Sequence, residues 1–163
     1  MNDRHSPLRT IFLAGTVSAT IDIVYACSFH YFNSGTSPLR ILQAIASGIL
    51  GPAAFDGGNA SAALGLAAHY FILIVAAGLY YAVSQRLPLL LDRAYACGLL
   101  FGGGIWLTMN YIVLPLSAAP AFKGGSALGF WSNLAVHVLL LGPAIALVLR
   151  RHRRRDSAVT LRR

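Results

Sequence analysis

The sequence predicts an all-α membrane protein, because it is more apolar than a soluble domain and its apolar residues form long uninterrupted segments. Of the 163 residues, 56% are hydrophobic and only 11% are charged, and the mean hydropathy is +0.64. Soluble domains contain about 25% charged and roughly 45–50% apolar residues. Both figures indicate a chain whose solvent is largely a lipid bilayer.

Four segments are long enough to span a membrane, since a helix needs about 20 mostly apolar residues to cross a hydrocarbon core of roughly 30 Å. We expect them to form an antiparallel four-helix bundle in a single integral membrane domain of residues 1–163, with spans at about 10–31, 59–83, 94–114 and 129–149. The first segment exceeds the roughly 7–15 apolar residues of a signal-peptide core and contains Asp22. We therefore interpret it as a retained span.

The basic residues predict the orientation of these spans. Eleven of the 13 Lys and Arg residues lie in the two termini and in the loop 84–93, whereas the other two loops contain only Arg40 and Lys123. Because Lys and Arg concentrate on the cytoplasmic side, we expect both termini in the cytoplasm of a bacterial inner membrane. The basic tail 150–163 is expected to contact anionic lipids. Nucleic-acid binding is not expected, because the tail has no aromatic or folded reader beside its charge.

A short helix is predicted at about 38–50, in the first outer loop. Ser37 suits the N-cap, Pro38 suits the first helical position, and Gly51 and Pro52 follow the segment. Its 13 or so residues are too few to cross the membrane. We expect it to lie in the outer interface, to dip back against the bundle, or to be a capped loop helix with a packing role only.

Repeated phrases suggest a 2+2 internal duplication, in which each copy is a pair of helices. The matching segments are 54–58 with 121–125, 63–65 with 127–129, and 20–22 with 108–110. The second and fourth spans also carry one histidine each, His69 and His137. Both copies would start from the cytoplasm, which predicts a parallel repeat about an axis along the membrane normal.

A layer of polar side chains is the candidate site, because ionisable groups inside a span are costly and mark function by default. It comprises Asp22, His69, Asn110 and His137, one on each span, with Asn133 one turn before His137. Counted from the outer ends at 1.5 Å per residue, Asp22, His69 and His137 lie at similar depths. The sequence therefore predicts a single buried layer displaced toward the outer face.

Three interpretations of this layer remain open. The first is a hydrogen-bonded network that fixes helix register. The second is a site for a proton, a small solute or a metal, with Asp22, His69 and His137 as candidate ligands. The third is a membrane redox component that binds haem or metal, with the two histidines as axial haem ligands. Other cofactors are unknown, and none is required.

No catalytic residues are predicted, because the chain contains no GxSxG, HExxH or Walker sequence. This favours a non-enzymatic protein of unknown biochemical role. Gly98 and Gly102 form a GxxxG face that another helix can approach closely, within the bundle or in a homo-oligomer.

Several short motifs together resemble the YagU-type bacterial inner-membrane proteins. They are residues 14–19, His69 in the second span, 114–116 after the third, Ser132, Asn133 and His137 in the fourth, and the arginine cluster 150–155. The resemblance covers most of the chain. It implies a multi-pass inner-membrane protein without established chemistry, loosely linked to acid tolerance.

Overall fold

The computed structural model describes residues 6–120 and 126–160, and side chains in the last helix up to Arg153. These residues are almost entirely helical and contain no strand, which confirms the all-α prediction. The elements are α1 (Pro7–Ser34), α2 (Pro38–Leu50), the 3-10 turn η1 (Gly51–Phe55), α3 (Gly58–Ser84), α4 (Leu89–Asp92), α5 (Ala94–Thr108), the π-turn η2 (Met109–Val113), α6 (Leu114–Leu116), α7 (Ala127–Val136), the π-turn η3 (His137–Leu141) and α8 (Gly142–Thr160).

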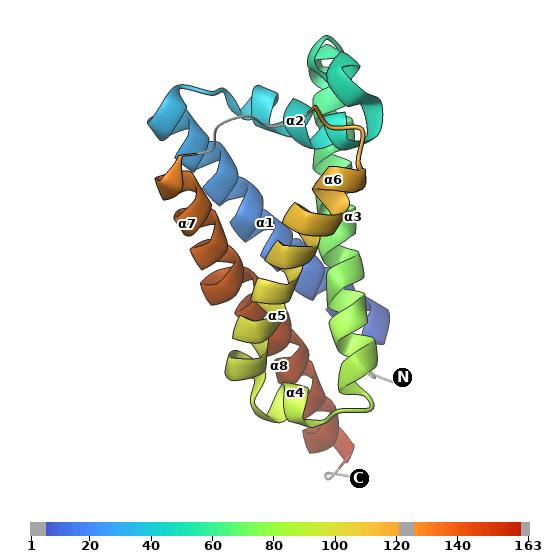
Figure 1. The fold of residues 1–163 in the computed structure, drawn as a ribbon. Coiled ribbons are helices and arrows are strands. Elements are labelled where there is room, and N and C mark those ends of the chain that lie inside the picture. The colour runs from blue at the N-terminus through green and yellow to red at the C-terminus, as the bar shows by residue number, and fades with distance from the viewer. Residues whose placement is uncertain (1–5, 121–125, 161–163) are drawn as a thin grey trace.

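Five helices within the described residues are long and apolar enough to cross a membrane. They are Pro7–Ser34, Pro38–Phe55, Gly58–Ser84, Ala94–Leu116 and Ala127–Arg153. Four of them run lengthwise between the two ends of the molecule, whereas Pro38–Phe55, which contains α2, lies across one end (Figure 1). The third helix consists of α5, η2 and α6 together, and the fourth helix of α7, η3 and α8.

The predicted short helix is present, and its N-terminal signals act as expected. Pro38 is the first residue of α2, and the Ser37 side chain accepts a hydrogen bond from the backbone N–H of Arg40 at 3.3 Å. This satisfies one of the donors that a helix start leaves free.

The polar face of α2 points inward, which the sequence pattern does not reveal. Gln43 and Ser47 are buried, and Gln43 Nε2 donates to the Gly58 carbonyl at 3.1 Å. Ile49 and Leu50, in contrast, are exposed. A helix at a water interface presents the opposite arrangement, with its charged face outward. The packing therefore favours the expectation that this segment lies back against the bundle.

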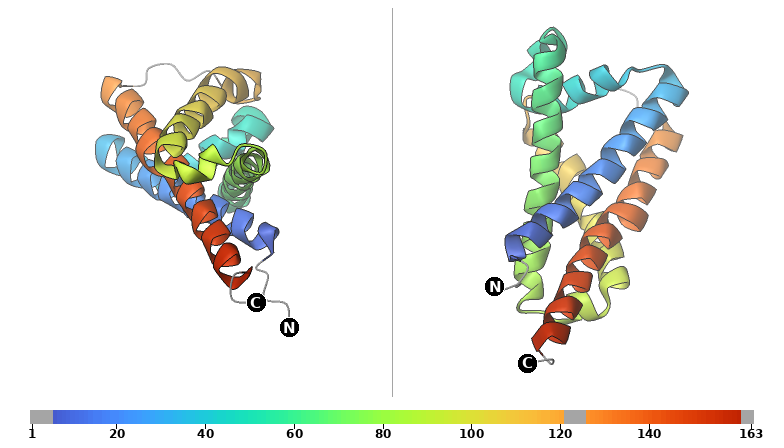
Figure 2. Two further views of the ribbon diagram at one scale, coloured as in Figure 1. Left: turned by 90° about the horizontal axis from the view of Figure 1, so that it is seen from below. Right: turned by 180° about the vertical axis from the view of Figure 1, so that it is seen from behind.

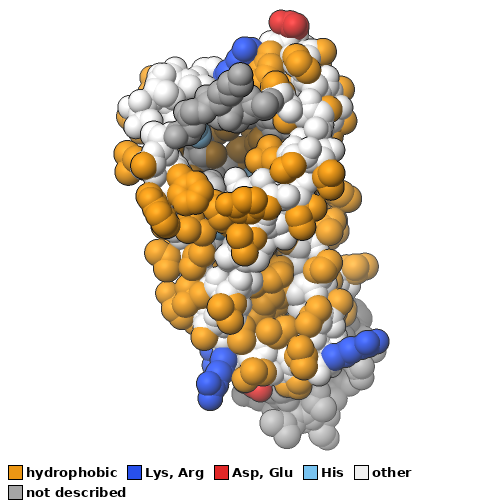
Figure 3. Space-filling model, in the orientation of Figure 1, with side chains coloured by type: hydrophobic (Ala, Val, Ile, Leu, Met, Phe, Trp, Pro, Cys, Tyr) orange, Lys and Arg blue, Asp and Glu red, His pale blue; other side chains and the backbone are white. Residues whose placement is uncertain are grey.

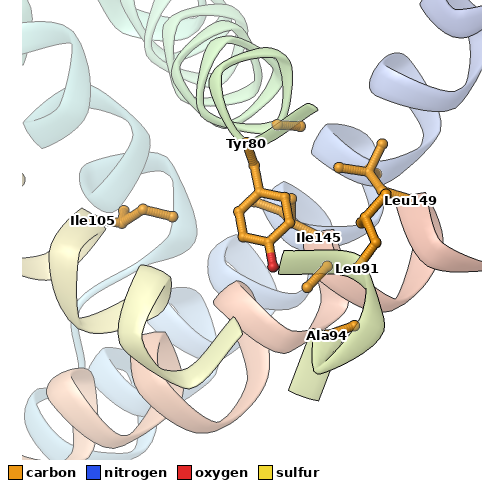
Figure 4. Close-up of a cluster of buried hydrophobic side chains, with 9 residues drawn as sticks. Tyr80, Leu91, Ala94, Ile105, Ile145 and Leu149 are labelled. Carbon is orange, nitrogen blue, oxygen red and sulfur yellow. The ribbon is translucent and has the colours of Figure 1, made fainter. Parts of the chain in front are cut away.

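The lengthwise helices converge at one end and splay at the other (Figures 1 and 2). α1 begins and α8 ends at the convergent end, near α4. A cluster of buried apolar side chains fills this end, with contributions from α1, α3, α4, α5 and α8 (Figure 4). Tyr80 lies within the cluster, and its hydroxyl donates to the Leu90 carbonyl at 2.8 Å, which ties α3 to the short connection before α5.

Glycines bring the third and fourth helices into backbone contact. A Cβ atom on Gly102 would overlap the carbonyl of His137, and one on Gly142 would overlap the carbonyl of Gly98. A Cβ on Gly98 would lie 2.7 Å from the Cα of Pro143, closer than van der Waals contact allows. The predicted GxxxG face is thus occupied within the chain, by η3 and the start of α8.

Both of these helices widen to a π-turn near a residue of the predicted polar layer. The N–H of Leu114 bonds to the Met109 carbonyl, and the N–H of Gly142 bonds to that of His137, each five residues back. Asn110 lies in the first π-turn, and His137 opens the second. Such turns are rare and occur frequently at functional sites.

The proposed duplication remains a prediction. One of its matching segments, 121–125, lies outside the described residues, as does Lys123. Both the second and the fourth spans are nevertheless helical throughout the predicted ranges, 59–83 and 129–149.

Gly102→Ala should lower the free energy of unfolding by about 1–3 kcal/mol, because the added methyl group overlaps backbone atoms that cannot move aside cheaply. Gly104→Ala is the matched control, since a Cβ there meets nothing within 4 Å. Thermal unfolding in detergent, followed by circular dichroism, compares the two. Equal stability of both variants would contradict backbone contact at Gly102.

Candidate functional site

Asp22 and His69 are brought together where α1 packs on α3. Asp22 Oδ2 lies 3.8 Å from His69 Nε2, and the two side chains are only 15% and 9% exposed. His69 Nε2 lies 3.0 Å from the Ala19 carbonyl oxygen. Because a carbonyl can only accept, Nε2 carries the proton and donates it to this carbonyl.

The Asp22 carboxylate is consequently left without a strong partner. The distance of 3.8 Å to His69 exceeds that of a hydrogen bond. Its other oxygen, Oδ1, is buried and has no hydrogen-bond partner. Buried polar atoms are almost always satisfied in folded proteins, so an exception calls for an explanation such as a bound proton, water or ion.

Two hydrogen bonds between α1 and the fourth helix fix the level of Asp22. Ser18 Oγ donates to the Leu141 carbonyl at 3.1 Å, and the hydroxyls of Tyr25 and Ser132 lie 2.7 Å apart. The two helices run in opposite directions (Figure 1). Asp22 is therefore level with residues 136–137, which places it at the height of His137.

A second polar group joins the third and fourth helices. Trp106 Nε1 donates to Asn133 Oδ1 at 2.9 Å, and Asn110 Nδ2 donates to the Trp106 carbonyl at 2.9 Å. His137 Nδ1 lies 2.9 Å from the Asn133 carbonyl and donates to it by the same reasoning as for His69. At each π-turn, then, a polar side chain bonds to the carbonyl four residues back.

The five predicted residues thus fall into two groups of different character. Asn110, Asn133 and His137 each make a hydrogen bond of ordinary length, which suits a network that fixes helix register. Asp22 and His69 form the other group, and there the carboxylate is the unsatisfied member.

The metal hypothesis finds little support in this geometry. Among the described residues, no three His, Cys, Asp or Glu side chains are grouped closely enough to hold a metal ion. Asp22, His69 and His137, the candidate ligands, are therefore not assembled into a metal centre. Haem ligation stays a prediction.

An open pocket of about 440 Å³ lies beyond Asp22 toward the splayed end. It is lined by Tyr25, Ser28, Phe29, Phe32 and Asn33 of α1. Figure 3 shows the surface hollowed at this end, whereas the residues that line the pocket all belong to α1. Asp22, Tyr25, Phe29 and Phe32 follow one another at intervals of three or four residues, so they share one face of α1.

Sequence reasoning missed Trp106, which is 5% exposed and connects Asn110 to Asn133. Trp106 lies four residues before Asn110, and residues at this spacing share a helix face, so the sequence could have indicated that the two side chains lie together. The pairing of Tyr25 with Ser132 had no comparable signal, because it depends on how α1 and α7 pack.

In comparisons with protein-family models, curated proteins and solved structures, no match to this chain was found. The resemblance to YagU-type proteins accordingly stays a prediction.

Trp106→Phe should lower the free energy of unfolding by about 1 kcal/mol, because it leaves Asn133 Oδ1 without its donor. Trp131→Phe is the control, since Trp131 is 64% exposed. Chemical unfolding in detergent micelles measures both. The interpretation fails if Trp131→Phe is as destabilising as Trp106→Phe.

Proposed function

We propose that this chain is a four-span protein of the bacterial inner membrane whose Asp22–His69 pair binds and releases a proton. The observation that carries the proposal is the buried Asp22 Oδ1 without a hydrogen-bond partner, beside a histidine in an apolar helix pair. The five apolar helices support membrane insertion. α2 lies across one end of the molecule (Figure 1), which supports a count of four spans formed by the lengthwise helices.

The charge distribution supports cytoplasmic termini and contact with anionic lipids. Arg9, Arg86, Arg93 and Arg151 are exposed, and all belong to elements that meet at the convergent end. Arg153 forms an ion pair with Asp92 at the same end. An arginine near an anionic surface contributes about 1 kcal/mol to the attraction. The convergent end therefore faces the cytoplasm in this proposal, and the hollowed end faces the periplasm.

A proton is the ligand that fits Asp22 with the fewest additional requirements. An Asp at the centre of a membrane helix costs about 2.5–3.5 kcal/mol when no partner compensates it. Residues 10–34, 58–84, 94–116 and 127–149 contain no Lys or Arg, so the spans provide no permanent countercharge. Protonation of the carboxylate removes the charge.

A purely structural role fits Asp22 less well than it fits the other polar residues. Ser18, Asn110 and Trp106 each donate to an acceptor at 2.9–3.1 Å. A carboxylate that served only to fix register would be expected to have its oxygens satisfied in the same way. Asp22 instead keeps one oxygen 3.8 Å from His69 and the other unpaired.

Infrared spectra of the protein in lipid nanodiscs, recorded over a pH titration, test the proton site. We expect a carboxylic-acid band that appears on acidification, is lost in Asp22→Asn and shifts in His69→Gln. Asp56→Asn, at an exposed position outside the spans, should leave this band unchanged. If the Asp22→Asn spectrum keeps every titrating band of the unaltered protein, the proton-site proposal is wrong.

Reporter fusions at Arg163 test the topology. A cytoplasmic C-terminus should make a green fluorescent protein fusion fluorescent and an alkaline phosphatase fusion inactive. A fusion of the phosphatase after Asp56, in the first outer loop, should in contrast be active. The opposite pattern at either position would overturn the proposed orientation.

A further inference from the structure

We infer that the Asp22 site also binds a small organic cation with an aromatic or apolar body, which competes with the proton. This rests on the proposed function, because it assigns a second ligand to the same carboxylate. The observations behind it are the uncompensated charge of Asp22 and the aromatic pocket on the same face of α1.

The open pocket presents an aromatic face of α1 to a ligand. Three of its five lining residues are aromatic: Tyr25, Phe29 and Phe32. The rings of Tyr25 and Phe29 lie 5.6 Å apart at an interplanar angle of 30°, so they form a continuous aromatic surface. Aromatic faces attract cations that lie within about 6 Å of the ring centroid.

Asp22 lies one helical turn before Tyr25 on α1, just outside the residues that line the pocket. Only the contact of 3.8 Å to His69 holds the carboxylate, so no hydrogen bond has to break for the side chain to rotate toward the pocket. The Tyr25 hydroxyl is already occupied by Ser132. A ligand in the pocket would therefore contact the ring face of Tyr25 and not its hydroxyl.

Charge complementarity determines the class of ligand. Residues 10–34, 58–84 and 127–149, which surround Asp22, contain no Lys or Arg. Outside the arginine-rich tail 150–163, the titratable side chains on the elements that pack against α1 are the exposed Arg40 on α2, His137 in η3, and His69, Tyr70, Tyr80 and Tyr81 on α3. An anion would thus find no cationic partner. A quaternary ammonium pairs with the carboxylate without donating a hydrogen bond, while its apolar substituents contact the rings of Tyr25 and Phe29.

A matched pair of probes tests the inference: phenyltrimethylammonium and its uncharged isostere, tert-butylbenzene. Binding to the full chain in nanodiscs of uncharged lipid is measured by equilibrium dialysis. We expect the cation to bind, its Kd to rise as the pH falls, and Asp22→Asn to raise that Kd about tenfold or more. Phe29→Leu should weaken binding by severalfold, whereas Asp56→Asn should have no effect.

The outcomes separate the two proposals. Equal binding of both probes, or an unchanged Kd in Asp22→Asn, overturns the cation site and indicates an apolar groove only. Loss of the cation site with the Asp22 infrared band intact leaves the proton site standing. Circular dichroism of Asp22→Asn confirms that the variant folds, and Phe29→Leu, which keeps the carboxylate, provides an independent test of the pocket.

Discussion

The backbones of α5 and of the segment from His137 to Pro143 touch at Gly98, Gly102 and Gly142, and much of the remaining packing follows from that approach. In a bilayer, neighbouring helices gain no hydrophobic stabilisation relative to lipid, so close van der Waals contact has to hold them. The contact lies toward the convergent end, next to the buried cluster around Tyr80. Beyond it the helices diverge, and the divergence creates the hollow in which a site can form (Figures 1 and 3).

The polar residues form two groups, one whose members are hydrogen-bonded and one that contains the unpaired carboxylate. Where the third and fourth helices are close, Trp106 and Asn133 meet, and Asn110 and His137 bond to carbonyls beside the two π-turns. The bonds from Asn110 and His137 give backbone carbonyls a partner where the two helices widen. On the other side of the bundle, α1 and α3 bury Asp22 and His69 together, but His69 Nε2 already donates its hydrogen bond to the Ala19 carbonyl. The unsatisfied carboxylate is therefore a consequence of the packing.

Much of the fold was predictable from the sequence because membrane insertion imposes strong local rules. Continuous apolar segments, flanked by glycine, proline and arginine, marked the long helices to within a few residues, except at the C-terminal end, where α8 continues past the predicted boundary at 149 to Thr160. Ser37 and Pro38 marked the start of α2. The inward orientation of its polar face was not predictable, because that depends on the Gly58 carbonyl as a partner for Gln43. The two π-turns were also not predicted, because the composition of these segments does not distinguish them from the α-helix around them.

For the polar residues, the sequence by itself determined which ones lie inside spans and at roughly what depth, because helical rise converts position into height. Depth alone, however, does not say which side chains meet. Only the tertiary structure decided that Asp22 pairs with His69, that Asn133 pairs with Trp106, and that one oxygen of Asp22 remains unpaired. The reason is physical: contacts between helices depend on their rotation and crossing, which small residues such as Gly102 set through packing with segments distant in the chain.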